Sequence, residues 1–107
     1  MRQNSLPFSA VSAADQPAVA ELENPLDDHR LRLRHVVASY GGGTPSRGLL
    51  TISDGADVDW KIDLPDGRPV VLQALDLQCG PGANITLTLA AAGAGVVGKV
   101  SAYATFE

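Results

Sequence analysis

Three arginines at the spacing of a β-strand are the most unusual chemical feature of this sequence. Arg30, Arg32 and Arg34 alternate with apolar residues. On a strand every second side chain lies on the same face, so the three guanidinium groups would form a row at intervals of about 7 Å. Such a row can bind carboxylates or phosphates. Because like charges in a row repel, we expect an acidic protein partner, within this chain or on a neighbouring subunit, with a solvated outer face as the alternative.

Five aspartates lie close together between positions 54 and 66. Oxygen-rich loops can bind calcium, but this segment lacks the twelve-residue pattern that ends in a bidentate glutamate. Asp54 fits an Asp-Gly turn, whereas Asp59 and Asp63 fit the polar face of a strand and could pair with the arginine row. The sequence therefore predicts no metal site among these aspartates, which are Asp54, Asp57, Asp59, Asp63 and Asp66.

Side chains that commonly carry out catalysis are few. The sequence has two histidines, His29 and His35, and one cysteine, Cys79. Zinc would need three or four ligands, and no Gly-x-Ser-x-Gly turn is present to carry a nucleophile. Cys79 lacks the basic neighbours that activate a thiol, and it can form no intrachain disulfide. We therefore expect no catalytic residue, no metal and no cofactor, and we interpret the protein as a non-enzyme.

Glycine-rich segments and aromatic residues indicate two further kinds of site. Gly41–Gly43 lacks the lysine of a phosphate-binding loop. Gly93–Gly98 has the spacing of a dinucleotide fingerprint but leads into a strand-like run, where that fingerprint needs a helix. Trp60, Tyr40 and Tyr103 could together form a platform that stacks against a sugar. Trp60, however, has the apolar parity of its strand, so we place it in the core.

The elements that would position these residues are strands. From His29 onward, apolar and polar residues alternate in about six segments, separated by turn residues at intervals of roughly 8–12 residues, as in sandwiches and barrels. We therefore predict an all-β fold: a small antiparallel β-sandwich with jelly-roll-like topology, formed by residues 29–107. The predicted core consists of Leu31, Leu33, Leu50, Ile52, Val58, Trp60, Ile62, Leu75, Leu77, Ile85, Leu87, Leu89, Val100 and Phe106.

The first 28 residues show no sustained period, and Pro7, Pro17 and Pro25 prevent a long helix. We interpret residues 1–28 as an extended N-terminal arm, and whether this segment is an arm or a first strand stays open. Prolines and serines interrupt the apolar residues near the start, so we predict no signal peptide.

Composition limits the partners. The formal net charge is −4, which argues against nucleic acid because phosphate binding needs a concentrated basic face. No segment approaches the roughly 20 apolar residues of a membrane span, so we predict no membrane partner.

Two segments carry a resemblance to a known class of proteins. Residues Ser39–Gly55 and Ile85–Val100 resemble small β-sandwich virion proteins of tailed bacteriophages, which decorate heads or form head-fibre and tail-fibre modules. The resemblance covers roughly residues 30–107 and has no invariant catalytic residue. It implies a non-enzymatic virion component, made in the cytoplasm of a host bacterium, that assembles as a trimer and uses its terminal arm to reach adjacent subunits.

From these observations we interpret the protein as a capsid decoration, or cement, protein on the outer surface of the head. Its partners would be the major capsid protein and further copies of itself, with a trimer favoured. The alternative is a head-fibre or tail-tip module that binds a host surface glycan or receptor; it predicts an exposed aromatic cluster near Trp60, Tyr40 or Tyr103. The predicted partner-binding residues are Leu6, Phe8, Val11, Val19 and Leu22 in the arm, with Arg30, Arg32 and Arg34 as an electrostatic clamp.

Overall fold

The computed structural model describes residues 5–24, 28–43, 47–55, 58–65, 68–73 and 77–106. These residues contain nine strands and no helix, so none of them belongs to a helix that could cross a membrane. The strands are β1 (Ser5–Val11), β2 (Ala18–Leu22), β3 (Leu31–Gly41), β4 (Arg47–Ser53), β5 (Asp59–Pro65), β6 (Val70–Leu72), β7 (Leu77–Gln78), β8 (Ile85–Leu89) and β9 (Val97–Phe106).

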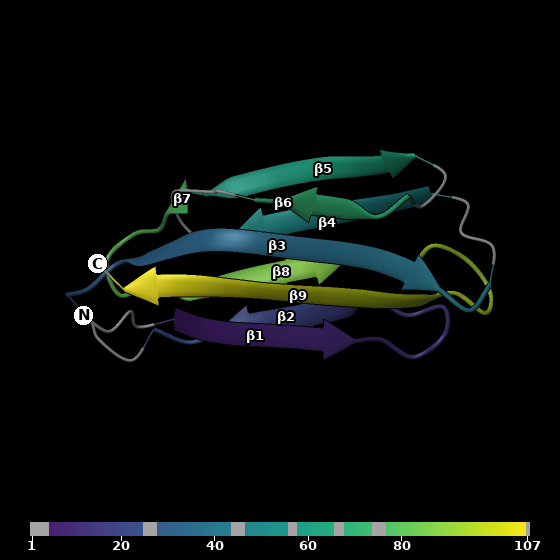
Figure 1. The fold of residues 1–107 in the computed structure, drawn as a ribbon, viewed down its shortest axis with the longest axis horizontal. Helices are drawn as coiled ribbons and strands as arrows, with labels where there is room; N and C mark the ends of the chain where they lie inside the picture. The colour runs from purple at the N-terminus through teal and green to yellow at the C-terminus, as the bar shows by residue number, and fades with distance from the viewer. Residues whose placement is uncertain are drawn as a thin grey trace.

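The strands form two antiparallel sheets that face each other. Sheet A has the order β1-β9-β3-β6, with β7 also paired to β3, and sheet B has the order β2-β8-β4-β5. Figure 1 looks onto sheet A, with β1, β9 and β3 in front of β2, β8 and β4. Apart from the short β7, the two sheets each have four strands in the order of a jelly roll, with the first and last strands side by side. The predicted all-β, jelly-roll-like sandwich is thus confirmed.

Residues 5–22 differ from the predicted extended arm, because they form two strands of the sandwich. β1 pairs along its whole length with β9, and β2 pairs along its whole length with β8. A jelly roll needs eight strands. Without β1 and β2, the strands after His29 would leave β9 and β8 as edge strands, each with one side unpaired. Pro7 is compatible with β1 because β1 is an edge strand. Residues 1–4 and 25–27 of the predicted arm lie outside the described residues.

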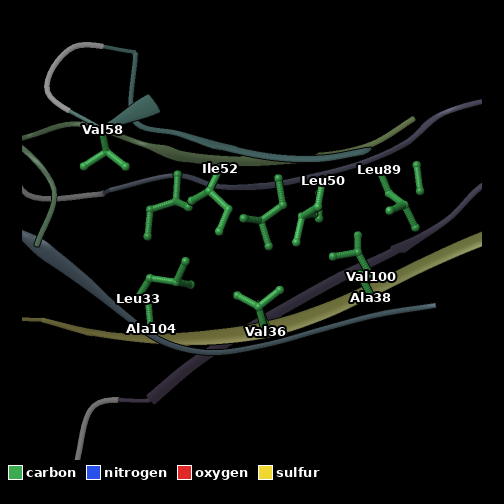
Figure 2. Packing of buried hydrophobic residues seen from close by; sticks show 14 of the residues in the cluster. Leu33, Val36, Ala38, Leu50, Ile52, Val58, Leu89, Val100 and Ala104 are labelled. Carbon is green, nitrogen blue, oxygen red and sulfur yellow. The ribbon is translucent and has the colours of Figure 1, made fainter. Parts of the chain in front are cut away.

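The core lies between the two sheets. Figure 2 shows side chains of sheet A, such as Leu33, Val36 and Val100, facing Leu50 and Ile52 of sheet B. Most of the predicted core is confirmed as buried, and Ile62 and Leu77 are partly buried against it. The confirmed residues are Leu31, Leu33, Leu50, Ile52, Val58, Ile85, Leu87, Leu89 and Val100.

The prediction of a buried Trp60 is wrong. Trp60 lies opposite the buried Ile52 in the β4–β5 ladder, so its parity is that of the core, but its side chain is 46% exposed. The reason is that β5 is the edge strand of sheet B, where a residue of core parity has neighbours on one side only. Leu75 and the side chain of Phe106, also predicted in the core, lie outside the described residues.

Candidate functional site

A β-bulge in β3 determines which side chains reach the outer face of sheet A. In the ladder with β9, Leu33 pairs with Ala104 and His35 pairs with Tyr103, so Arg34 is an extra residue. Leu33 and Val36 are both buried, and the two residues between them are half-buried on the other face. The bulge therefore sets Arg34 and His35 side by side on the outer face, an effect that bulges have near many functional sites.

Across the ladder, His35 stacks on Tyr103. The two ring centroids are 5.6 Å apart and the ring planes differ by 15°. The side chain of Tyr103 is 40% exposed, and neither its hydroxyl nor the His35 ring nitrogens hydrogen-bond to a described residue. The pair therefore forms a fixed aromatic ridge on the sheet, and its polar atoms remain available to a ligand.

Cationic side chains flank this ridge. The Arg34 Nε donates a hydrogen bond to the Thr105 Oγ1 at 3.1 Å, which orients the guanidinium group, and Arg32 pairs with the same Thr105 in the ladder. Lys99 is exposed on the same face of β9, nearer to the other end of the strand. Of the predicted arginine row, Arg32 and Arg34 thus lie on this face, whereas Arg30 is exposed just before β3 begins.

We call this surface the arginine–tyrosine face. It consists of the outward side chains Arg32, Arg34, His35, Lys99, Tyr103 and Thr105 of β3 and β9. It offers charged donors, aromatic rings and hydroxyl groups on two neighbouring strands of one sheet, so its geometry suits non-covalent binding of an extended ligand.

Within one molecule, the arginines of β3 do not pair with the aspartates of β5. β3 belongs to sheet A and β5 to sheet B, so their outward faces lie on opposite sides of the sandwich. Asp59 instead accepts hydrogen bonds from the Lys61 Nζ, at 3.0 Å and 3.2 Å to its two carboxylate oxygens. This ion pair is exposed, so it contributes little to stability.

The five predicted contact residues of the arm are divided between the core and two opposite faces. Leu6, Phe8 and Leu22 are partly buried against the core of their own sandwich. Val11 and Val19 are 67% and 52% exposed, but Val11 belongs to sheet A and Val19 to sheet B. The structure therefore does not bring the five together into one contact surface.

The other aromatic candidates are separate from Tyr103. The Tyr40 hydroxyl donates a hydrogen bond to the Ala90 carbonyl at 2.6 Å, and burial raises the pKa of this phenol. Tyr40 therefore links β3 to the residue after β8, and Trp60 lies on the edge strand of the other sheet. The three residues form no single aromatic cluster. Tyr103 is instead stacked on His35, a residue that the sequence offered only as a catalytic or metal-binding side chain.

The remaining reactive side chains have structural surroundings. The buried Asp54 carboxylate accepts hydrogen bonds from the backbone N–H groups of Val58 and Gly80, at 2.8 Å and 2.9 Å. Burial and, to a smaller extent, the Asp54 carboxylate raise the pKa of the Cys79 thiol to about 11. Cys79 is thus held as a neutral thiol, the less nucleophilic form.

The two histidines have different neighbours. His29 Nδ1 lies 2.9 Å from Asp28 Oδ1, and this hydrogen bond is the main cause that lowers the pKa of Asp28. His35 is stacked on Tyr103. Within the described residues, no group of three or more His, Cys, Asp or Glu side chains is arranged to hold a metal ion. Asp57 and Asp66 lie outside those residues.

One signal in the sequence could have revealed the site. Arg34 and His35 are consecutive polar residues between Leu33 and Val36, both of which are apolar. Two polar residues in a row break the period of two, and this is the pattern that a bulge produces in a strand with one buried face.

Fold and face together define a jelly-roll β-sandwich with a cationic, aromatic sheet surface. No protein-family model matches the sequence, and no match was found among the curated proteins. Among solved structures, a similar chain is described as TmCBM61 in complex with beta-1,4-galactotriose. It is 15% identical with a TM-score of 0.40, and the match covers 96% of this chain and 69% of that one. A likeness at this level carries no argument about the ligand of this chain.

Proposed function

We propose that the protein is a non-catalytic binding module that holds an extended glycan on the arginine–tyrosine face. The observation that carries the proposal is the stacked His35–Tyr103 pair, which lies at a bulge beside Arg34 on the outer face of sheet A, with Tyr103 exposed and His35 half-buried. Of the two roles expected from the sequence, this is the alternative one, a module that recognises a surface glycan.

The physical case rests on rigidity and on the type of side chain. Both rings lie on central strands of sheet A and are stacked on each other, so little side-chain freedom is lost when a ligand binds. An aromatic ring with a polar tip can contact the C–H surface of a sugar and bond to its hydroxyls. Groups on strands are also held more precisely than groups on loops.

The expected capsid decoration role stays a prediction, as do the trimer, the major capsid protein as partner and the location on a virion. The jelly roll is compatible with that role and with glycan binding, because it occurs in capsid proteins and in lectins, and a fold does not establish a function. In a decoration protein with this structure, β1 and β2 would not act as a free arm, because they are built into the two sheets.

The test is a glycan array probed with the isolated protein, followed by calorimetric titration of the glycans that bind. Tyr103→Ala should weaken binding about tenfold, because an aromatic contact contributes roughly 0.5–1.5 kcal/mol beyond its buried area. Trp60→Ala is the matched control: Trp60 is exposed to a similar extent, but it lies on the edge of sheet B. Its affinity should equal that of the wild type.

Two results would contradict the proposal. The first is an array on which no glycan binds. The second is a reversed pattern, in which Trp60→Ala abolishes binding and Tyr103→Ala, with an unchanged melting temperature, has no effect.

A further inference from the structure

Resting on this proposed function, we infer that the bound glycan is acidic: a polysaccharide with carboxylate or sulfate groups that pair with the arginines of the arginine–tyrosine face. The argument starts from the distribution of charge between the two sheets and continues with the position of Arg34.

The charged residues of the sheet A strands are all basic, whereas the strands of sheet B carry both signs. The chain has 12 acidic and 8 basic residues, but within the strands of sheet A there is no Asp or Glu, and the basic residues there are Arg32, Arg34 and Lys99. All three point outward. The strands of sheet B contain Glu21, Asp59 and Asp63 together with Arg47 and Lys61. A protein with a net charge of −4 thus keeps one sheet cationic, which favours an anionic ligand on that side.

The position of Arg34 connects this charge to the aromatic ridge. Arg34 precedes His35 directly, and its Nε is fixed by Thr105, which lies two residues from Tyr103 on the same face of β9. The guanidinium group is therefore held at Thr105, on the same face of sheet A as the two rings. A guanidinium fork binds carboxylates and sulfates through paired, charge-assisted hydrogen bonds. A sugar that contacts Tyr103 would thus place its acidic group within reach of Arg34 and Arg32.

The length of the face fits a polymer. Lys99 and Thr105 lie six residues apart on the same side of β9, which corresponds to about 20 Å. Several sugar rings would cover this distance, with cationic side chains near both ends and the aromatic ridge between them. A repeating acidic chain could therefore pair with Arg34 and Lys99 at the same time.

Nucleic acid fits the face less well. Single-stranded nucleic acids bind by stacking their bases on open aromatic faces, and here a face of His35 and a face of Tyr103 are occupied by each other. Duplex DNA needs many phosphate contacts, and the strands of sheet A supply only Arg32, Arg34 and Lys99 for them. Sugars instead can use the ring edges, the hydroxyl groups and the guanidinium groups together.

The experiment compares polymers that share a backbone. Polygalacturonate, its carboxyl-reduced neutral form, a sulfated form of that neutral polymer and a DNA duplex are titrated into the full chain at low and high salt. We expect both acidic polysaccharides to bind at least about tenfold more tightly than the neutral one at low salt, with a difference that shrinks as salt screens the charges. The DNA should bind more weakly than either acidic polysaccharide.

Charge-removing variants locate the contact. The measured quantity is the affinity for the acidic polysaccharides divided by the affinity for the neutral one. Arg34→Gln and Arg32→Gln should each lower this ratio about tenfold, towards one. Lys99 is exposed and its side chain makes no hydrogen bond to a described residue, so Lys99→Gln should fold. This variant tests the same face if an arginine variant fails to fold. Lys61→Gln removes a cation from the outer face of sheet B and should leave the ratio unchanged.

The possible results separate the inference from the proposed function. Equal binding of acidic and neutral polymers overturns the inference and leaves the glycan-binding module standing. Binding of none of the polysaccharides overturns both. The inference is also overturned if DNA binds as tightly as polygalacturonate. It is overturned as well if Arg34→Gln and Lys99→Gln keep the preference for acidic polymers and Lys61→Gln loses it.

Discussion

Deletion of Arg34 should leave the sheet in register, which is an unusual property for the removal of a residue from a strand. Arg34 is the residue that the β3–β9 ladder skips, because Leu33 pairs with Ala104 and His35 pairs with Tyr103. Without Arg34, the two regular halves of the ladder join directly. Leu33 and the residues after the bulge keep the faces that they have now, so the core is unchanged.

The expected cost of the deletion is small. It removes the partly buried hydrogen bond from the Arg34 Nε to the Thr105 Oγ1, and Arg34 also takes part in a further interaction. The loss of one hydrogen bond has a net cost of about 1 kcal/mol. A loss of this size lowers the melting temperature of a domain of about 100 residues by roughly 4–8 °C. The variant should therefore fold, and it should lose the preference for acidic polymers that Arg34 provides.

Deletion of Val37 is the matched control. Val37 occupies a regular position opposite Ser101, so its removal would turn Ala38 outward and Ser39 into the core. A buried hydroxyl without a partner costs about 1–3 kcal/mol, and the residues beyond it lose their packing as well. The total approaches the entire stability of a small domain, about 5–15 kcal/mol, so this variant should not fold.

Urea unfolding followed by far-ultraviolet circular dichroism distinguishes the two deletions. The reasoning would be refuted by a variant without Arg34 that is as unstable as the variant without Val37. It would equally be refuted by a loss that approaches the entire stability of a small domain, about 5–15 kcal/mol, because the two halves of the ladder would then not have joined in register.

Three further predictions concern residues that hold the sandwich together. Asp54→Ala leaves the N–H groups of Val58 and Gly80 without their acceptor and should lower the free energy of unfolding by about 2–5 kcal/mol in urea titrations, whereas a loss below 1 kcal/mol would contradict the role of this carboxylate. Gly48→Ala would place a Cβ 2.5 Å from the Tyr40 ring, which is held in place by the hydrogen bond to Ala90, and should lower the free energy of unfolding by about 1–3 kcal/mol. In the control Gly41→Ala the new Cβ meets no atom within 4 Å, and the loss should be less than half as large. Folding raises the pKa of the Cys79 thiol from 9.0 to about 11, so the native state binds the thiol proton more tightly than the unfolded state does. The protonated thiol therefore contributes to stability in full below pH 9. This contribution is lost as the pH rises towards 11. Cys79→Ala should lack this alkaline loss when the two proteins are compared at pH 8 and pH 10.5, and parallel curves would contradict it.

Strand parity predicted the core well because a two-layer sandwich has a single inside. Leu50 and Ile52, for example, are apolar at alternating positions and both are buried. Parity failed for Trp60 because it assigns a face to a side chain without saying whether neighbours cover that face, and β5 proved to be an edge strand. The first two strands were missed for a different reason: in β2 the buried positions are Ala18 and Ala20, which give little apolar contrast.

The candidate site could be predicted only in part. Alternation placed Arg32 and Arg34 on one face, because neighbouring residues of a strand are sufficient for that conclusion. The contact of His35 with Tyr103 depends on β9 lying beside β3, and a local pattern contains no strand order. The same limit explains why Asp59 and Asp63 could be considered as partners of the arginines until the structure assigned them to the other sheet.

The net charge of −4 and an acidic ligand are compatible, because charge acts locally at physiological salt. The shortest extent of the Cα trace is 20 Å, and the Debye length at physiological ionic strength is about 8 Å. The outward side chains of sheets A and B are therefore separated by more than two screening lengths. A ligand on sheet A interacts mainly with Arg32, Arg34 and Lys99, while the acidic residues of sheet B contribute little to its binding. The net charge is a sum over both faces, so it argues against an anionic partner that surrounds the whole molecule. An anionic ligand that covers only sheet A is compatible with this protein.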